Sequence, residues 1–252
     1  MITRIALARN LQEYLDVDRF KDYAPNGLQV EGCETIARIC TAVTASEGAI
    51  QEALRQEADA LLVHHGYFWR GEDPTIHGMK RRRLGLLMES NLNLLAYHLP
   101  LDCHLVLGNN ARLATKLKAV DIQTHASGNI PDLLWSGALP QSMTAPDLSR
   151  LLGAALNRTP LHVTGTDKPI KRLAWCSGAA HDLIEEAAQL GVDAYLSGEI
   201  SERTYYQAKE LGIHYFACGH HATERYGIQA LGEHLHTKFG LHHQFIDGDN
   251  PV

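Results

Sequence analysis

The chain has 252 residues, of which 45% are apolar, so it can fill the core of one large or two small domains, and disordered or low-complexity classes are excluded. No uncharged apolar run reaches the ~18 residues of a spanning helix, and Arg9 and Glu13 interrupt any signal-peptide core. The net charge of −6 argues against general nucleic-acid binding. Five scattered cysteines without CxxC spacing favour free thiols, so we expect a cytoplasmic protein that does not act at a membrane.

The first half of the chain alternates helical and extended patterns. Apolar side chains spaced as one helix face predict a helix over 2–16, and a turn at 24–27 precedes a strand over 28–32. Buried strands then alternate with helices: strands over 39–43, 60–63 and 92–97, and helices over 47–56, 80–89 and 111–118.

The second half repeats this order. Thr144 and Asp147 form the T-x-x-D pattern of a helix start, ahead of a helix to about residue 156 and a strand over 161–165. Three buried strands follow, each next to a helical segment: strands over 173–176, 194–196 and 215–218, and helices over 181–190, 202–211 and 224–238. Alternating strands and helices indicate an α/β class with largely parallel sheets.

The two halves also match residue by residue. Residues 28–32 match 161–165 at an offset of 133. Asp59 matches Asp193 at an offset of 134, which aligns His65 with Glu199. At an offset of 122, His98 aligns with His220 and Asp102 with Glu224. A repeat of this length is typical of a duplicated lobe rather than of a solenoid unit. We therefore expect two α/β lobes, 1–125 and 126–252, with mostly parallel or mixed sheets, whose late elements can pack in the other lobe.

Metal-binding side chains follow three of the predicted strands, at the edge where open α/β sheets bind ligands. They are His64 with His65, His98 with Asp102, and His220 with Glu224. Imidazole and carboxylate without thiolate suit Zn, Fe(II), Mn or Co better than Ca or Mg. A single histidine at a strand end is more often structural, and an H-x-x-x-E pair more often lies on a helix surface. Three clusters together favour a metal site, and adjacent histidines that point to opposite sides of a strand would suit two metals.

The chain carries the motifs YAPNGLQVEG at 23–32, VHHGYFW at 63–69, HLPLD at 98–102, GNN at 108–110 and GHHATE at 219–224. Together they resemble the YbgI-like branch of the Nif3-like family, whose members are often labelled GTP cyclohydrolase 1 type 2 homologues. The resemblance extends from about Asp22 to Pro251. It implies two intertwined α/β lobes, a homo-oligomeric ring of six subunits (a trimer of dimers), and a dinuclear site of two divalent metal ions per subunit that the second lobe closes. The implied metal ligands are His64, His65, Asp102, His220 and Glu224.

The role of His98 is less direct. The resemblance does not make it a ligand, although the repeat suggests one, so we expect His98 to orient Asp102 or a bound water. Two metals ~3.5–4 Å apart can share a hydroxide, which makes hydrolysis the natural reaction. The hypothesis is attack by that hydroxide on an electrophilic carbon or phosphorus, with protons moved by His98, His221 or Glu199.

Cations and aromatic side chains near the histidines suggest a nucleotide substrate. The run 80–83 (KRRR) could hold a triphosphate and Tyr67, Phe68 and Trp69 could stack a base, although a solvated helix face and a core role are the ordinary interpretations. Gly108–Asn110 is typical of helix capping. The sequence thus predicts a metal-dependent nucleotide hydrolase, with GTP ring opening suggested by family naming. The alternative is a non-catalytic metal-dependent ring that stores or senses metal, or a regulatory scaffold.

Overall fold

The chain forms two compact units in a computed structural model that describes all residues from 1 to 252. Unit 1 comprises Met1–Leu101 and Gly227–Asp249, and unit 2 comprises Asp102–Tyr226 and Asn250–Val252. None of the helices combines the length and the apolar character that crossing a bilayer requires.

The unit boundaries differ from the predicted lobes 1–125 and 126–252, and the cause is strand pairing. The predicted boundary falls inside β7 (Val120–Ser127), which forms an antiparallel pair with β8 (Ile130–Met143) in unit 2. This hairpin is not among the predicted elements. β7 alternates apolar and polar residues, but most of its side chains are exposed, so no buried run marks it as a strand of the core. Residues 227–249 return to unit 1, where β13 (His242–Phe245) extends the sheet.

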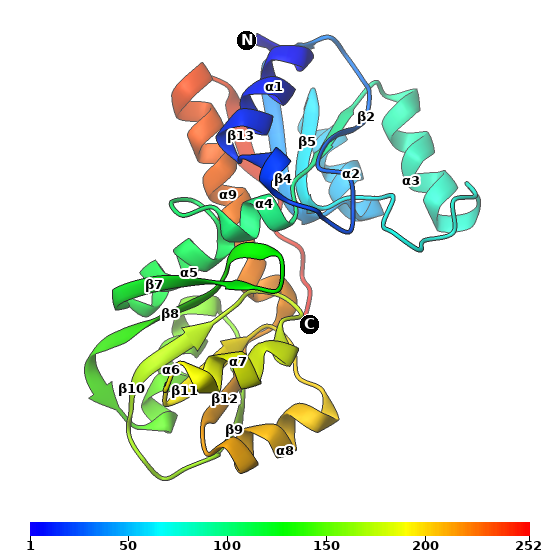
Figure 1. Ribbon diagram of the computed structural model, residues 1–252. Coiled ribbons are helices and arrows are strands. Elements are labelled where there is room, and N and C mark those ends of the chain that lie inside the picture. Colours follow the sequence, from blue (N-terminus) through cyan, green and yellow to red (C-terminus); the bar gives the residue numbers. More distant parts are fainter. The chain divides into compact units, whose positions relative to one another are not determined.

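Unit 1 is built on a five-stranded sheet with the order β13-β4-β5-β6-β2 (Figure 1). Strands β13, β4, β5 and β6 are parallel neighbours, whereas β2 lies antiparallel to β6. A separate antiparallel pair joins β1 to β3. The bounds are β1 (Ile2–Thr3), β2 (Gly27–Val30), β3 (Thr35–Ile36), β4 (Arg38–Thr44), β5 (Ala60–His65) and β6 (Asn93–Ala96).

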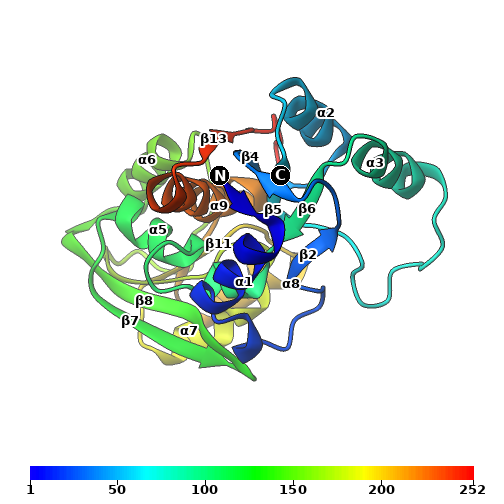
Figure 2. The ribbon, with the colours of Figure 1, turned by 90° about the horizontal axis from the view of Figure 1, so that it is seen from above.

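Helices cover both faces of this sheet, with α2 and α3 on one face and α1 and α9 on the other (Figure 2). Apolar side chains of α2 and α3 pack on β4, β5 and β6 in one buried cluster. Side chains of Thr3 and Ser46 cap α1 and α2 by accepting backbone N–H groups. The bounds are α1 (Arg4–Tyr14), η1 (Val17–Arg19), α2 (Glu47–Arg55), α3 (Gly78–Glu89) and α9 (His220–Phe239), which begins in unit 2.

Unit 2 contains a six-stranded mixed sheet with the order β7-β8-β10-β11-β12-β9. Its central strands β10, β11 and β12 are parallel, and β8 and β9 flank them in antiparallel pairs. The mixed α/β class is therefore confirmed in both units. The bounds are β9 (Leu161–Val163), β10 (Ile170–Trp175), β11 (Ala194–Ser197) and β12 (His214–Ala217).

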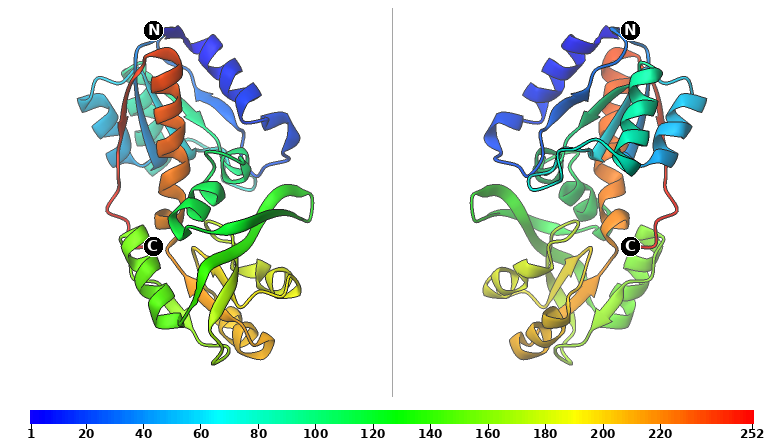
Figure 3. Two further views of the ribbon diagram at one scale, coloured as in Figure 1. Left: turned by 90° about the vertical axis from the view of Figure 1, so that its left-hand side faces the viewer. Right: turned by 90° about the vertical axis from the view of Figure 1, so that its right-hand side faces the viewer.

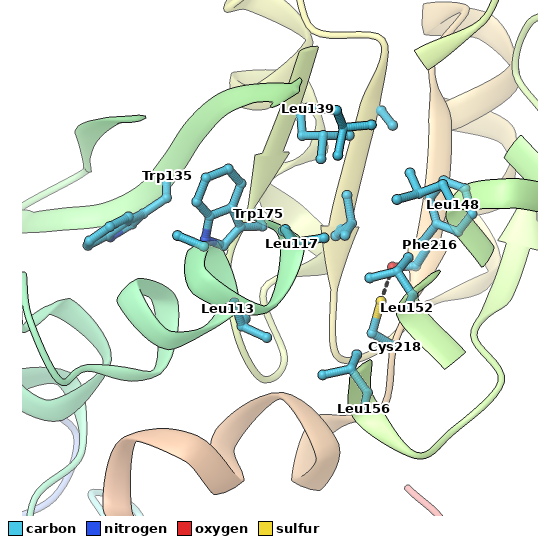
Figure 4. Close-up of a cluster of buried hydrophobic side chains, with 14 of the residues drawn as sticks. Leu113, Leu117, Trp135, Leu139, Leu148, Leu152, Leu156, Trp175, Phe216 and Cys218 are labelled. Atoms are coloured by element: carbon cyan, nitrogen blue, oxygen red, sulfur yellow. Dashed lines mark hydrogen bonds between the residues drawn. The ribbon is translucent and has the colours of Figure 1, made fainter. Parts of the chain in front are cut away.

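The central strands of unit 2 are buried on both faces, which explains their continuous apolar runs. On one face, Leu113, Leu152 and Trp175 belong to a cluster between α5, α6 and the sheet (Figure 4). On the other face, α7 and α8 pack against side chains that alternate with the first set. Figure 3 shows the two helix pairs on opposite sides of the sheet. The bounds are α4 (Leu99–Cys103), α5 (Asn109–Leu117), α6 (Ala145–Leu156), η2 (His181–Leu183), α7 (Ile184–Gln189) and α8 (Glu202–Leu211).

The internal repeat of the sequence corresponds to repeated structure. The orders β4-β5-β6-β2 and β10-β11-β12-β9 match, and in each the last strand is antiparallel. Asp59 Oδ2 accepts the backbone N–H groups of residues 37 and 38, and Asp193 Oδ2 accepts those of residues 171 and 172. Gly32 and Gly165 each lie so close to a backbone carbonyl that neither has room for a Cβ. The two units therefore share a local geometry as well as a topology.

Candidate metal centre

In unit 1, β5 delivers two histidines at its carboxyl end. His64 is fully buried, and its Nδ1 donates to the Tyr97 carbonyl at 2.9 Å. The His65 Nδ1 lies 3.2 Å from the Thr44 hydroxyl. Both histidines lie within β5, and their ring centroids are 4.6 Å apart.

A third imidazole, that of His98, lies next to this pair. The ligand atoms of His64, His65 and His98 are all within 4.8 Å of one another. His98 follows β6, and its Nδ1 is 2.8 Å from Oδ1 of Asp22. Burial alone would raise the pKa of Asp22, but the hydrogen bond and charge of His98, with bonds from Asn26 and the backbone, hold it below its ordinary value. No local pattern in the sequence distinguishes Asp22 as a functional residue, although it directly precedes the first family motif.

The aromatic residues 67–69 were expected either to stack a base or to fill the core, and they differ in which of these roles their positions suit. Tyr67 is buried, and its hydroxyl donates to the Ala45 carbonyl at 2.6 Å, as a core residue does. Trp69 meets the His98 ring edge-on, with centroids 5.0 Å apart. Phe68 is 40% exposed and has a positive φ of 66°, a strained conformation for an aromatic residue.

Two of the four cations in the basic run on α3 lie next to carboxylates. Lys80 lies 2.9 Å from Glu72, and Arg82 lies 3.3 Å from Glu47. The exposed Arg82 side chain agrees with the solvated-face interpretation. The Lys80 side chain does not, because it is only 12% exposed.

In unit 2, Asp102 is held by two side chains from different elements. Its Oδ1 accepts hydrogen bonds of 2.8 Å from Asn109 Nδ2 and from Ser177 Oγ. Ser177 is fixed in turn, because its backbone N–H donates to Asn110 Oδ1. The segment Gly108–Asn110 does contain the helix start, because Gly108 is the N-cap of α5, but no side chain caps the helix and the two asparagines are buried instead. Capping and buried polar networks use the same residue types, so the local sequence did not separate them.

The pair His220 and Glu224 lies at the start of α9, which begins at His220 rather than at the predicted residue 224, and the four-residue spacing places both on one helix face. His220 Nε2 is 3.1 Å from Glu224 Oε2, and its Nδ1 is 2.6 Å from Glu199 Oε1. Burial alone would lower the pKa of His220, but hydrogen bonds to Glu224 and Glu199, and their charges, raise it to about 9. His221, a residue expected to move protons, is buried, and its backbone N–H donates to the carbonyl of Val252.

This donor chemistry fits divalent transition metals. Imidazole nitrogens gather at the end of β5, and a carboxylate and an imidazole meet at the start of α9. In both places a hydrogen-bond partner holds the ring nitrogen that faces away from the cluster, as is usual for histidine ligands of metals. The residues present are therefore suited to hold metal ions.

Comparisons with known proteins identify the family of the chain. The family model Duf34/NIF3 (NGG1p interacting factor 3) matches residues 2–251. Two relatives, each named "GTP cyclohydrolase 1 type 2 homolog", come from Vibrio cholerae (51% identical, covering 100% of both chains) and Allochromatium vinosum (50% identical, covering 98% of this chain and 96% of the relative).

Solved structures match over the whole chain. One, described as protein ybgI of unknown function, has a TM-score of 0.95 at 45% identity, and one from Thermus thermophilus has 0.90 at 34% identity. Each match covers 100% of both chains. The resemblance seen in the sequence motifs is thereby confirmed, and the chain belongs to the Duf34/NIF3 (NGG1p interacting factor 3) family.

Proposed function

We propose that this protein is a dinuclear metal-dependent hydrolase that acts on nucleotides, with GTP as the first substrate to test. The names of its relatives and the chemistry of its donors support this proposal. The five side chains that we assign to the metals are His64, His65, Asp102, His220 and Glu224.

The observation that carries the proposal is the way the chain orients these groups. The His64 and His220 rings are each fixed through Nδ1, by a carbonyl and a carboxylate respectively, which directs Nε2 toward a cation. Asp102 is fixed through two donors on one oxygen. Two histidine rings from separate strand ends that are both held through Nδ1, together with a fixed carboxylate, are the arrangement that metal ligands need.

The chain's own residues define what each group contributes. Two divalent ions would supply Lewis acidity and make nearby water more acidic. Asn109 and Ser177 hold the Asp102 carboxylate in one orientation, and Glu199 holds the His220 ring and can accept its Nδ1 proton. Glu224 is almost fully buried, so its charge favours a bound cation over solvent.

The test is turnover by the purified, metal-loaded chain on a nucleotide panel that includes GTP, with product analysis by chromatography and mass spectrometry. Activity should disappear on chelation and in His64→Ala. The matched control is His242→Ala, which removes an exposed imidazole from β13 in the same unit and should retain full activity.

Absence of turnover across the panel, together with tight metal retention, would overturn the hydrolase and favour the metal-dependent scaffold or storage protein. Elemental analysis of protein purified without chelators distinguishes Zn, Fe, Mn and Co. We also propose the hexameric ring as the functional assembly, and sedimentation velocity would test it directly.

A further inference from the structure

The connection between β5 and α3, residues 66–77, contains no helix or strand and lies wholly in unit 1 (Figure 1). It carries three aromatic residues, and two of them already have partners. Tyr67 is buried, and Trp69 meets the His98 ring edge-on while its indole N–H donates to a backbone carbonyl at 3.2 Å. Phe68 is 40% exposed, so its ring is the one that remains available to a ligand.

The chain holds Phe68 in this position against its conformational preference. Its φ of 66° lies in the left-handed region, which an aromatic L residue rarely adopts. Glu72 supports the turn, because its Oε2 accepts the Trp69 N–H at 3.0 Å and its Oε1 lies 2.9 Å from Lys80 Nζ. Lys80 also donates to the Asp73 carbonyl, and its Nζ lies 5.5 Å from the centre of the Phe68 ring. Backbone strain that surrounding contacts maintain in this way is concentrated at functional sites.

The last cation of the basic run on α3 differs from the others. Lys80 and Arg82 have carboxylate partners, whereas Arg83 is half-buried and makes no hydrogen bond or ion pair. Its Nε is fully buried without a partner, while its terminal nitrogens reach the surface. A guanidinium presents a planar set of donors that matches the oxygens of a phosphate, so an unpaired one in this setting suits an anionic ligand.

Phe68 and Arg83 both lie next to Tyr67. The rings of Phe68 and Tyr67 meet edge-on, with centroids 6.3 Å apart. Burial raises the pKa of Tyr67 to about 12, and the charge of Arg83 opposes this rise, because the guanidinium lies near the phenol. Phe68 also follows His65 by only three residues, which limits the separation of their Cα atoms to ~11 Å. A nucleoside triphosphate is long enough to span such a distance.

We propose that Phe68 and Arg83 form a nucleotide subsite in unit 1, where the Phe68 ring stacks on the base and the Arg83 guanidinium binds a phosphate group. The inference rests on the proposed function and names the groups that recognise its substrate. Every base has a planar face, so stacking on Phe68 favours nucleotides as a class without selecting guanine.

The test uses three probes that separate the two halves of the ligand: guanosine, inorganic triphosphate and GTP. Calorimetric titration of the metal-loaded chain gives the Kd of each probe. Phe68→Ala should weaken the binding of guanosine and GTP ~5–100-fold and leave that of inorganic triphosphate unchanged. Phe68→Tyr should restore wild-type affinity, because it restores the aromatic face.

Arg83→Gln should show the complementary pattern. It should weaken the binding of inorganic triphosphate and GTP ~10–100-fold and leave that of guanosine unchanged. The matched controls are Ile76→Ala, an exposed apolar residue of the same connection, and Arg82→Gln, the neighbouring cation of α3, and both should bind all three probes like the wild type. Elemental analysis and circular dichroism check that each variant is metal-loaded and folded.

The outcomes distinguish this inference from the function it rests on. If the wild-type chain hydrolyses a nucleotide and Phe68→Ala and Arg83→Gln bind that nucleotide with unchanged affinity, the inference is overturned while the hydrolase stands. If GTP binds with the predicted losses in both variants but no nucleotide is turned over, the subsite stands and the hydrolase fails. If the metal-loaded wild-type chain binds neither guanosine nor GTP, the inference is overturned.

Discussion

Replacing Asn109 with alanine should weaken metal binding with little change in the fold. The substitution removes the 2.8 Å bond from Nδ2 to Asp102 Oδ1 and leaves Ser177 as the other side-chain donor to that oxygen. A hydrogen bond to a charged group contributes ~1.5–3 kcal/mol. If this bond serves to orient the Asp102 carboxylate toward a metal, the alanine variant should bind metal ~10–100-fold more weakly. That is the range observed when an outer hydrogen-bond partner of a metal ligand is removed.

The assay is competition between the protein and a chelator of known affinity for Zn, followed by thermal denaturation of the metal-free forms. Ser177→Ala should give a loss of the same order, because its hydroxyl binds the same oxygen. Asn129→Ala is the control, since Asn129 is exposed in the turn between β7 and β8. An Asn109→Ala protein with wild-type affinity but a lower metal-free Tm would refute the reasoning, because the bond would then be purely structural.

Three further predictions concern stability in unit 2. Gly165→Ala should cost ~3 kcal/mol or more by denaturant titration, because a Cβ there would overlap the Ile213 carbonyl oxygen. Burial and the charge of His214 lower the pKa of His162, so the stability that the neutral ring contributes is present above pH ~6.5 and should be lost as the pH falls below it. Asp193→Ala should cost ~1–3 kcal/mol, because two backbone N–H groups lose their acceptor.

A matched control variant tests the physical reason given for each of these three predictions. Gly85→Ala, on a helix with room for a Cβ, should not destabilise the chain, and equal effects at the two glycines would contradict the steric argument. His162→Gln should flatten the decline of Tm between pH 6.5 and 5, and an unchanged slope would show that another group is responsible. Asp59→Ala should match Asp193→Ala, since Asp59 has the same two bonds in unit 1.

Much of the fold was predictable because the central strands are buried on both faces. Such strands read as continuous apolar runs, and the runs at 60–63 and 194–196 fall within β5 and β11. The N-cap at Thr144 was also predictable, because capping depends on residues three positions apart. By contrast, β13 pairs with β4 about 200 residues earlier in the chain, and only that pairing makes it a strand.

In the candidate metal centre, too, some features could be predicted from the sequence and others could not. The types of metal-binding side chains could be recognised from the ends of strands, because local sequence determines where a strand stops. Their supports could not, because Asp22 and His98 are 76 residues apart and Asp102 and Ser177 are 75 apart. Carboxylates and hydroxyls at such separations have no local signature, and the fold alone brings them to the ligands.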